Sequence, residues 1–91
     1  MARLGTFKGT GVLVVGQQRI DPIRYWFEVS LEDGLRSAEG RLTGDRLGLE
    51  AAVKASSARL ELEDGTPVQI VVTGLDAQGA SAVVSGRIPG F

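Results

Sequence analysis

The feature that most constrains the fold is the two-residue alternation of side chains in residues 23–32, IRYWFEVSLE. One set of positions is apolar, and the other is mainly charged or polar: Tyr25, Phe27, Val29 and Leu31 against Arg24, Trp26, Glu28, Ser30 and Glu32. Successive side chains of a β-strand point to opposite faces, so this segment predicts a strand with one buried face. Pro22 stands just before it, where a missing N–H is least harmful.

Other alternating segments, separated by glycine-containing turns, predict about six strands. Phe7, Leu13 and Val15 share one face of residues 6–15 with two glycines, which indicates a bulge, a sharp bend or the close approach of another backbone there. The remaining expected strands span residues 35–42, 58–63, 68–75 and 80–88. The chain is therefore predicted to be mainly β: a small single domain over residues 1–91, folded as an antiparallel barrel or rolled sheet.

One segment, RLGLEAAVKAS at residues 46–56, fits two patterns. Its apolar residues alternate as in a strand, yet it is rich in Leu, Ala, Glu and Lys, which favour helix. Asp45 can cap the helix, and we predict a short helix at 46–56, with Gly48 as the main objection. Gly44 and Asp45 also fit a two-residue turn.

The order strand–strand–strand–helix–strand–strand, with a long first strand bent at glycines, resembles OB-fold topology. The same order is equally compatible with other small six-stranded barrels. The resemblance implies a face that binds single-stranded nucleic acid. The Arg and Asp/Asn-x-Ser-x-x-Gly pattern of PilZ nucleotide-binding barrels is missing, so that function is not carried over.

The residue types argue against an enzyme. The chain has neither His nor Cys, so nucleophiles of the Ser-His-Asp and Cys-His kinds and the usual zinc and haem ligand sets cannot be built. The tetrapeptide Leu-Glu-Asp-Gly occurs twice, beginning at Leu31 and Leu62. Because Asp-Gly favours turns, we interpret both copies as hairpin turns rather than acidic metal sites. We expect no catalytic residues, no metal and no cofactor.

Charge and hydropathy bound the partners and the location. The net charge is −1 and the basic residues are dispersed, which weighs against nucleic acid and anionic membranes as general partners. The first residues lack the uninterrupted apolar stretch of a signal peptide, and no segment is long enough to span a membrane. The expectation is a soluble, cytoplasmic protein.

The candidate binding or interface residues are surplus aromatic and apolar side chains. Arg24 and Trp26 share the strand side opposite Tyr25 and Phe27. An exposed indole there would stack on a base, a sugar or a partner's side chain; alternatively, Trp26 packs under the helix or into a dimer interface. Several valines also fall on outward positions, where a helix, a second sheet layer or a partner subunit must cover them: Val12, Val14, Val71 and Val83. The candidates are Arg24, Trp26, Val71, Val83 and Phe91.

Three arginines, Arg36, Arg41 and Arg46, flank the Gly44–Asp45 segment and are expected to gather at one end of the sheet. Acidic residues are interleaved with them, so we expect mutual neutralisation rather than an anion site. The leading hypothesis is a non-enzymatic domain that acts by protein–protein interaction, as a homo-oligomer or an accessory subunit. The alternative is an OB-like module that binds single-stranded nucleic acid or a small ligand on the Arg24/Trp26 face.

Overall fold

The structure, a computed structural model, describes residues 2–90. It confirms a mainly β chain with six strands and one short helix. In chain order the elements are β1 (Ala2–Val15), β2 (Gln18–Glu32), β3 (Leu35–Gly44), α1 (Arg46–Ala55), β4 (Ser57–Glu61), β5 (Pro67–Asp76) and β6 (Gly79–Val84).

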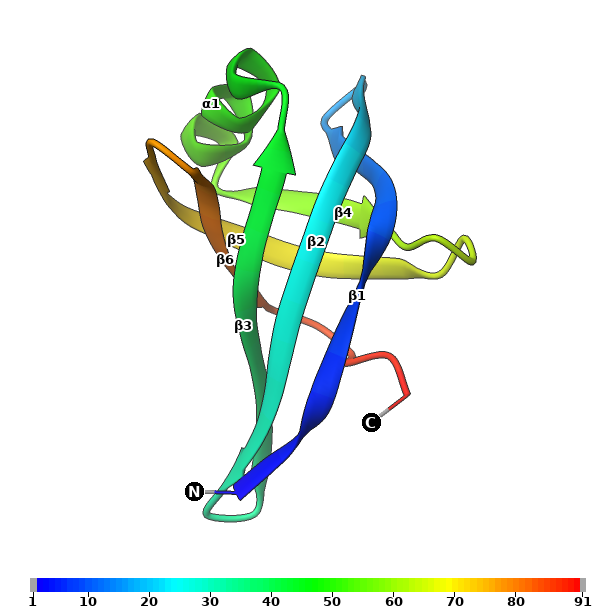
Figure 1. Cartoon of the computed structure of the whole chain (residues 1–91), viewed down its shortest axis with the longest axis vertical. Helices are drawn as coiled ribbons and strands as arrows, with labels where there is room; N and C mark the ends of the chain where they lie inside the picture. The colour runs from blue at the N-terminus through cyan, green and yellow to red at the C-terminus, as the bar shows by residue number, and fades with distance from the viewer. Residues whose placement is uncertain (1, 91) are drawn as a thin grey trace.

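The strands form one antiparallel sheet that closes on itself in the order β1–β2–β3–β6–β5–β4 (Figure 1). Closure depends on a short contact, in which only Val12, Leu13 and Val14 of β1 pair with β4. The helix separates β3 from β4 in the sequence, as the OB-like order predicts, but the sheet has six strands where an OB-fold has five. The helix lies at the end of the sheet opposite the β2–β3 hairpin (Figure 1).

The first three strands are longer than the closed part of the sheet needs. Residues 2–11 of β1 pair with β2 alone, and residues 35–38 of β3 lie beyond the segment that pairs with β6. The excess forms a three-stranded extension that ends at the β2–β3 hairpin (Figure 1). We call this extension the arm: residues 2–5, 29–32 and 35–38.

The core lies inside the closed sheet and follows the predicted alternation. Tyr25, Phe27 and Val29 are buried, as is Leu13 on β1. Phe7 stacks on Phe27 with ring centroids 5.0 Å apart. The register of β1 against β2 shifts between Gly11 and Leu13, which confirms the predicted bulge next to Gly11.

The helix begins where Asp45 was expected to cap it. The Asp45 carboxylate accepts a hydrogen bond from the Gly48 N–H at 3.0 Å. Gly48 is buried, and a Cβ there would lie 2.7 Å from Ile20, so the glycine allows the helix to approach β2 closely. The interpretation of Gly44–Asp45 as a two-residue turn was wrong, because β3 continues to Gly44 and the helix follows at once.

Two predicted strands are shorter than expected. β4 ends at Glu61, the last residue paired with β5, and the turn begins at Leu62. β6 ends at Val84 rather than residue 88. Beyond it, the Ser85 N–H still donates to the Gln69 carbonyl at 2.9 Å before the chain leaves the sheet. Within residues 2–90, no helix is long and apolar enough to cross a membrane.

Candidate functional site

Trp26 is the large aromatic side chain on the outside of the sheet. Its neighbours Tyr25 and Phe27 point into the core, so Trp26 points outward, and it remains 43% exposed. It does not pack under the helix, because the two hollows that it lines are formed by residues of the strands and by none of α1. Of the alternatives predicted for this residue, packing under the helix is therefore wrong.

Strand register determines the neighbours of Trp26. Lys8 on β1 and Arg41 on β3 stand directly opposite it, and Arg24 is two residues earlier on β2. Lys8, Arg24 and Trp26 line one shallow hollow together with Gly9, Thr10 and Tyr25. Within residues 2–90, no carboxylate forms an ion pair with Lys8 or Arg24.

A second hollow, of about 270 Å³, lies on the other side of Trp26. Glu28, Glu39 and Val83 contribute to its lining. Glu28 and Glu39 are opposite each other on adjacent strands, an arrangement that is unfavourable for like charges. Arg3 partly relieves it by pairing with Glu28 at 3.2 Å.

We call this outer surface the Trp26 face. It extends over β1, β2, β3 and β6 and comprises Lys8, Arg24, Trp26, Glu28, Glu39, Arg41 and Val83.

The structure brings most of the predicted interface residues together. Val83 lines the same hollow as Trp26, and Val71 is the direct cross-strand partner of Val83. Both valines are partly exposed. Phe91 lies outside the described residues. The other outward valines, Val12 and Val14, are on the β1–β4 side of the sheet and do not belong to this face.

Asp76, the last residue of β5, organises the edge of the face. Asp76 accepts two hydrogen bonds from the Arg41 guanidinium, at 2.6 and 2.7 Å, and its carbonyl accepts one from Arg46 at 2.8 Å. Hydrogen bonding from Arg41 is the main reason that the pKa of Asp76 is below its usual value. The pairing is not predictable from spacing, because Arg41 and Asp76 are 35 residues apart.

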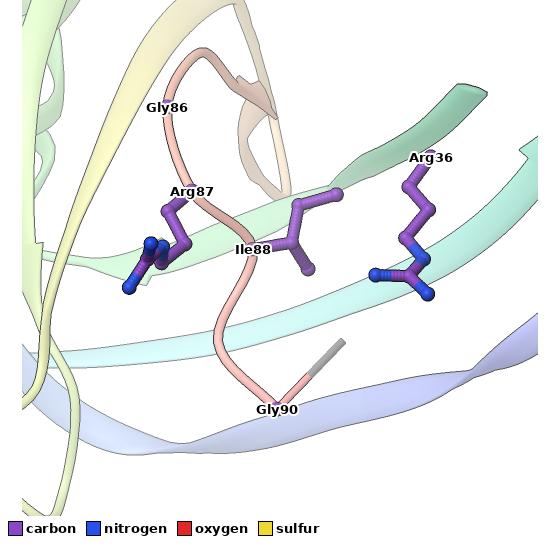
Figure 2. A pocket seen from close by; sticks show the side chains of 5 residues that line it. All are labelled: Arg36, Gly86, Arg87, Ile88 and Gly90. Carbon is purple, nitrogen blue, oxygen red and sulfur yellow. The ribbon is translucent and has the colours of Figure 1, made fainter.

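The three arginines do not gather as expected. Arg41 and Arg46 both bind Asp76, whereas Arg36 pairs with Leu31 near the tip of the arm. The reason is the length of β3, which separates Arg36 from Gly44 by most of the strand. Arg36 lines a different hollow with Arg87 and Ile88. Figure 2 shows the two arginine side chains extending to opposite sides of Ile88, so they do not converge on a common ligand position.

The acidic turns do not converge either. Glu32 and Asp33 lie at the tip of the arm, whereas Glu63 and Asp64 lie between β4 and β5. In the part of the chain that the structure describes, no three Asp or Glu residues are grouped so that they could hold a metal ion. The Trp26 face therefore stands as the candidate site. No protein-family model, curated protein or solved structure matches this chain.

Proposed function

We propose that this chain is a soluble, cytoplasmic, non-enzymatic domain that acts by protein–protein contact through the Trp26 face, including contact with itself. One observation carries the proposal: Trp26 is 43% exposed on a hydrogen-bonded sheet, between two hollows. Trp is enriched at the centres of protein interfaces, where it provides a large contact area with little loss of conformational freedom.

The surroundings of Trp26 support this proposal. Val83 and Val71 extend its apolar surface across β6 and β5, and the Arg41–Asp76 pair borders that surface. An apolar centre with a charged border is the usual anatomy of a protein interface. The backbone beneath it is fixed by pairing on both sides, because β2 lies between β1 and β3. Such a surface loses little entropy when it binds.

A photo-crosslinking amino acid in place of Thr10 tests the proposal in living cells. Thr10 is exposed and lines the hollow beside Trp26. We expect a discrete protein adduct that disappears in a Trp26→Ala background and is not formed by a probe at Lys54, an exposed position on α1. Adducts that are identical at both positions, or unchanged by Trp26→Ala in folded protein, would contradict it.

A second candidate function is binding of single-stranded nucleic acid on the same face. Lys8 and Arg24, two cations without ion pairs in residues 2–90, flank the exposed indole. Aromatic stacking combined with cations is how OB-folds bind single strands. The acidic Glu28 and Glu39 and the net charge of −1 oppose it. Tryptophan fluorescence during an oligonucleotide titration at low salt decides this, and unchanged fluorescence would end the idea.

A further inference from the structure

The charges on the Trp26 face change sign along the strands. Cations occupy the cross-strand row of Trp26 and the next row toward the helix end: Lys8, Arg41 and Arg24. Carboxylates occupy the rows toward the tip of the arm: Glu28, Glu39 and Glu32. Asp76 offsets one cation and Arg3 offsets one carboxylate, so each end keeps a surplus of its own sign.

The boundary between the two signs falls beside Trp26. Its own row contains Lys8 and Arg41, and the adjacent row contains Glu28 and Glu39. This surface has one positive end, one negative end and an aromatic side chain at the boundary. It is complementary to a second copy of itself that is rotated by 180° about an axis lying in the plane of the face and perpendicular to the strands. Rotation about an axis parallel to the strands would place like charges together.

We infer that the partner of the Trp26 face is a second copy of this chain, packed face to face with its β2 antiparallel to the first. This inference rests on the proposed function and specifies its partner. The two-fold axis crosses β2 between Trp26 and Glu28. Each Arg41 then lies over Glu39 of the other copy, and each Arg24 lies over Ser30, between Glu28 and Glu32 of the other copy.

The proposed arrangement relieves two unfavourable features of the isolated chain. Glu28 and Glu39, which oppose each other on adjacent strands, gain cations from the other copy. Trp26 loses its contact with water. A stable dimer of standard size buries about 800 Å² per partner. That is roughly a seventh of the 5506 Å² surface of the described residues, an area that a face of four strands can supply.

Complementary charge reversal tests whether the positive end of one Trp26 face lies over the negative end of the other. Sedimentation equilibrium of the wild-type chain should show a dimer that weakens as salt rises. Arg24→Glu alone and Glu32→Lys alone should each weaken it about tenfold or more, because each places like charges together. An equimolar mixture of the two variants should restore dimers near wild-type strength. Lys54→Glu, at an exposed position on α1, is the matched control for Arg24→Glu.

Thiol cross-linking tests the antiparallel orientation, and the absence of natural Cys makes it specific. With a short bifunctional thiol reagent, a mixture of Arg24→Cys and Ser30→Cys chains should give the mixed cross-linked dimer in preference to either homodimer. Preferred cross-linking of Arg24→Cys with itself would overturn the orientation. Strictly monomeric wild-type protein would overturn the inference entirely, whereas an adduct with a different protein at position 10 in cells would still support the proposed function.

Discussion

The two Leu-Glu-Asp-Gly segments have the same sequence and different structures. In the first, Asp33 and Gly34 form a two-residue loop between the paired residues Glu32 and Leu35. Both have positive φ, 53° and 79°, as a type I′ hairpin turn requires. The second belongs to a five-residue connection between Glu61 and Pro67.

Contacts with the rest of the molecule explain the difference. In the second segment, the Leu62 side chain packs against the core and the Glu63 N–H donates to the Tyr25 hydroxyl at 3.1 Å. The Glu63 carboxylate accepts from the Thr10 N–H at 3.3 Å, which satisfies a donor of β1 just before the three residues that pair with β4. The first segment stands at the tip of the arm, and a Cβ on Gly34 would meet nothing within 4 Å. The tetrapeptide thus specifies a turn, and the tertiary contacts decide which one.

The largest expected effect comes from disrupting the close contact between β1 and β4 just before the second turn. Gly11 crosses β4 so closely that a Cβ would lie 2.0 Å from the carbonyl oxygen of Glu61, the residue just before that turn. Because the obstacle is backbone, Gly11→Ala should lower the free energy of unfolding by about 3 kcal/mol, the upper range for overpacking. Urea unfolding followed by tryptophan fluorescence measures it.

Gly74→Ala is the matched control for Gly11→Ala. Gly74 also lies in a strand at an irregular position, next to the register shift between β5 and β6, but a Cβ there meets nothing within 4 Å. Its free energy of unfolding should change by less than about 0.5 kcal/mol. Equal losses for the two variants would show that β1 does not approach Glu61 as the structure describes.

The two turns share a glycine with positive φ, and its replacement should have a smaller effect than Gly11→Ala. Gly34 and Gly65 have φ of 79° and 90°, and a Cβ added to either glycine would meet no atom within 4 Å. Gly34→Ala and Gly65→Ala should each lower the free energy of unfolding by about 1 kcal/mol, since the penalty is that of left-handed backbone alone. Urea unfolding of the two variants measures it. A much larger loss of stability for Gly65→Ala than for Gly34→Ala would mean that the surroundings of Gly65 also resist a methyl group.

A smaller effect is expected from Tyr25→Phe, which should change the second turn and leave the first unaffected. Tyr25→Phe removes the oxygen that accepts the Glu63 N–H, and about 1 kcal/mol of stability should be lost with it. Amide hydrogen exchange should accelerate at Glu63 and stay unchanged at Leu35, the residue after the first turn. Unchanged exchange at Glu63 would contradict the contact.

Much of the fold follows from local sequence because its determinants are local. Alternation over residues 23–32 predicts the burial of Tyr25, Phe27 and Val29, although Leu31 on the same face is only half-buried. Asp45 predicts the start of the helix. Gly48 was an objection to that helix because its reason is tertiary, namely the close approach to Ile20.

The candidate site was less accessible to prediction. Alternation placed Arg24 and Trp26 on one side of β2, but it could not align Lys8, Arg41 and Val83 beside them, since register between strands depends on the whole sheet. The partnership of Asp76 with Arg41 was missed for the same reason.

The smallest expected effect is a pH-dependent contribution to stability from the second turn that the first turn lacks. The Thr66 N–H donates to the Asp64 carboxylate at 2.9 Å, and this hydrogen bond is the main reason that the pKa of Asp64 is below its ordinary value of 3.8. A carboxyl whose pKa is lowered by folding stabilises the protein above the unfolded pKa, and this contribution disappears as pH falls through the folded value. Asp64→Asn should therefore reduce stability slightly at neutral pH and progressively less as the solution is acidified below 3.8. Urea unfolding across this range measures the difference.

Asp33→Asn is the matched control, because within residues 2–90 the Asp33 carboxylate accepts no hydrogen bond. A gap between Asp64→Asn and wild type that stays constant with pH would contradict a role for the Asp64 charge in the second turn.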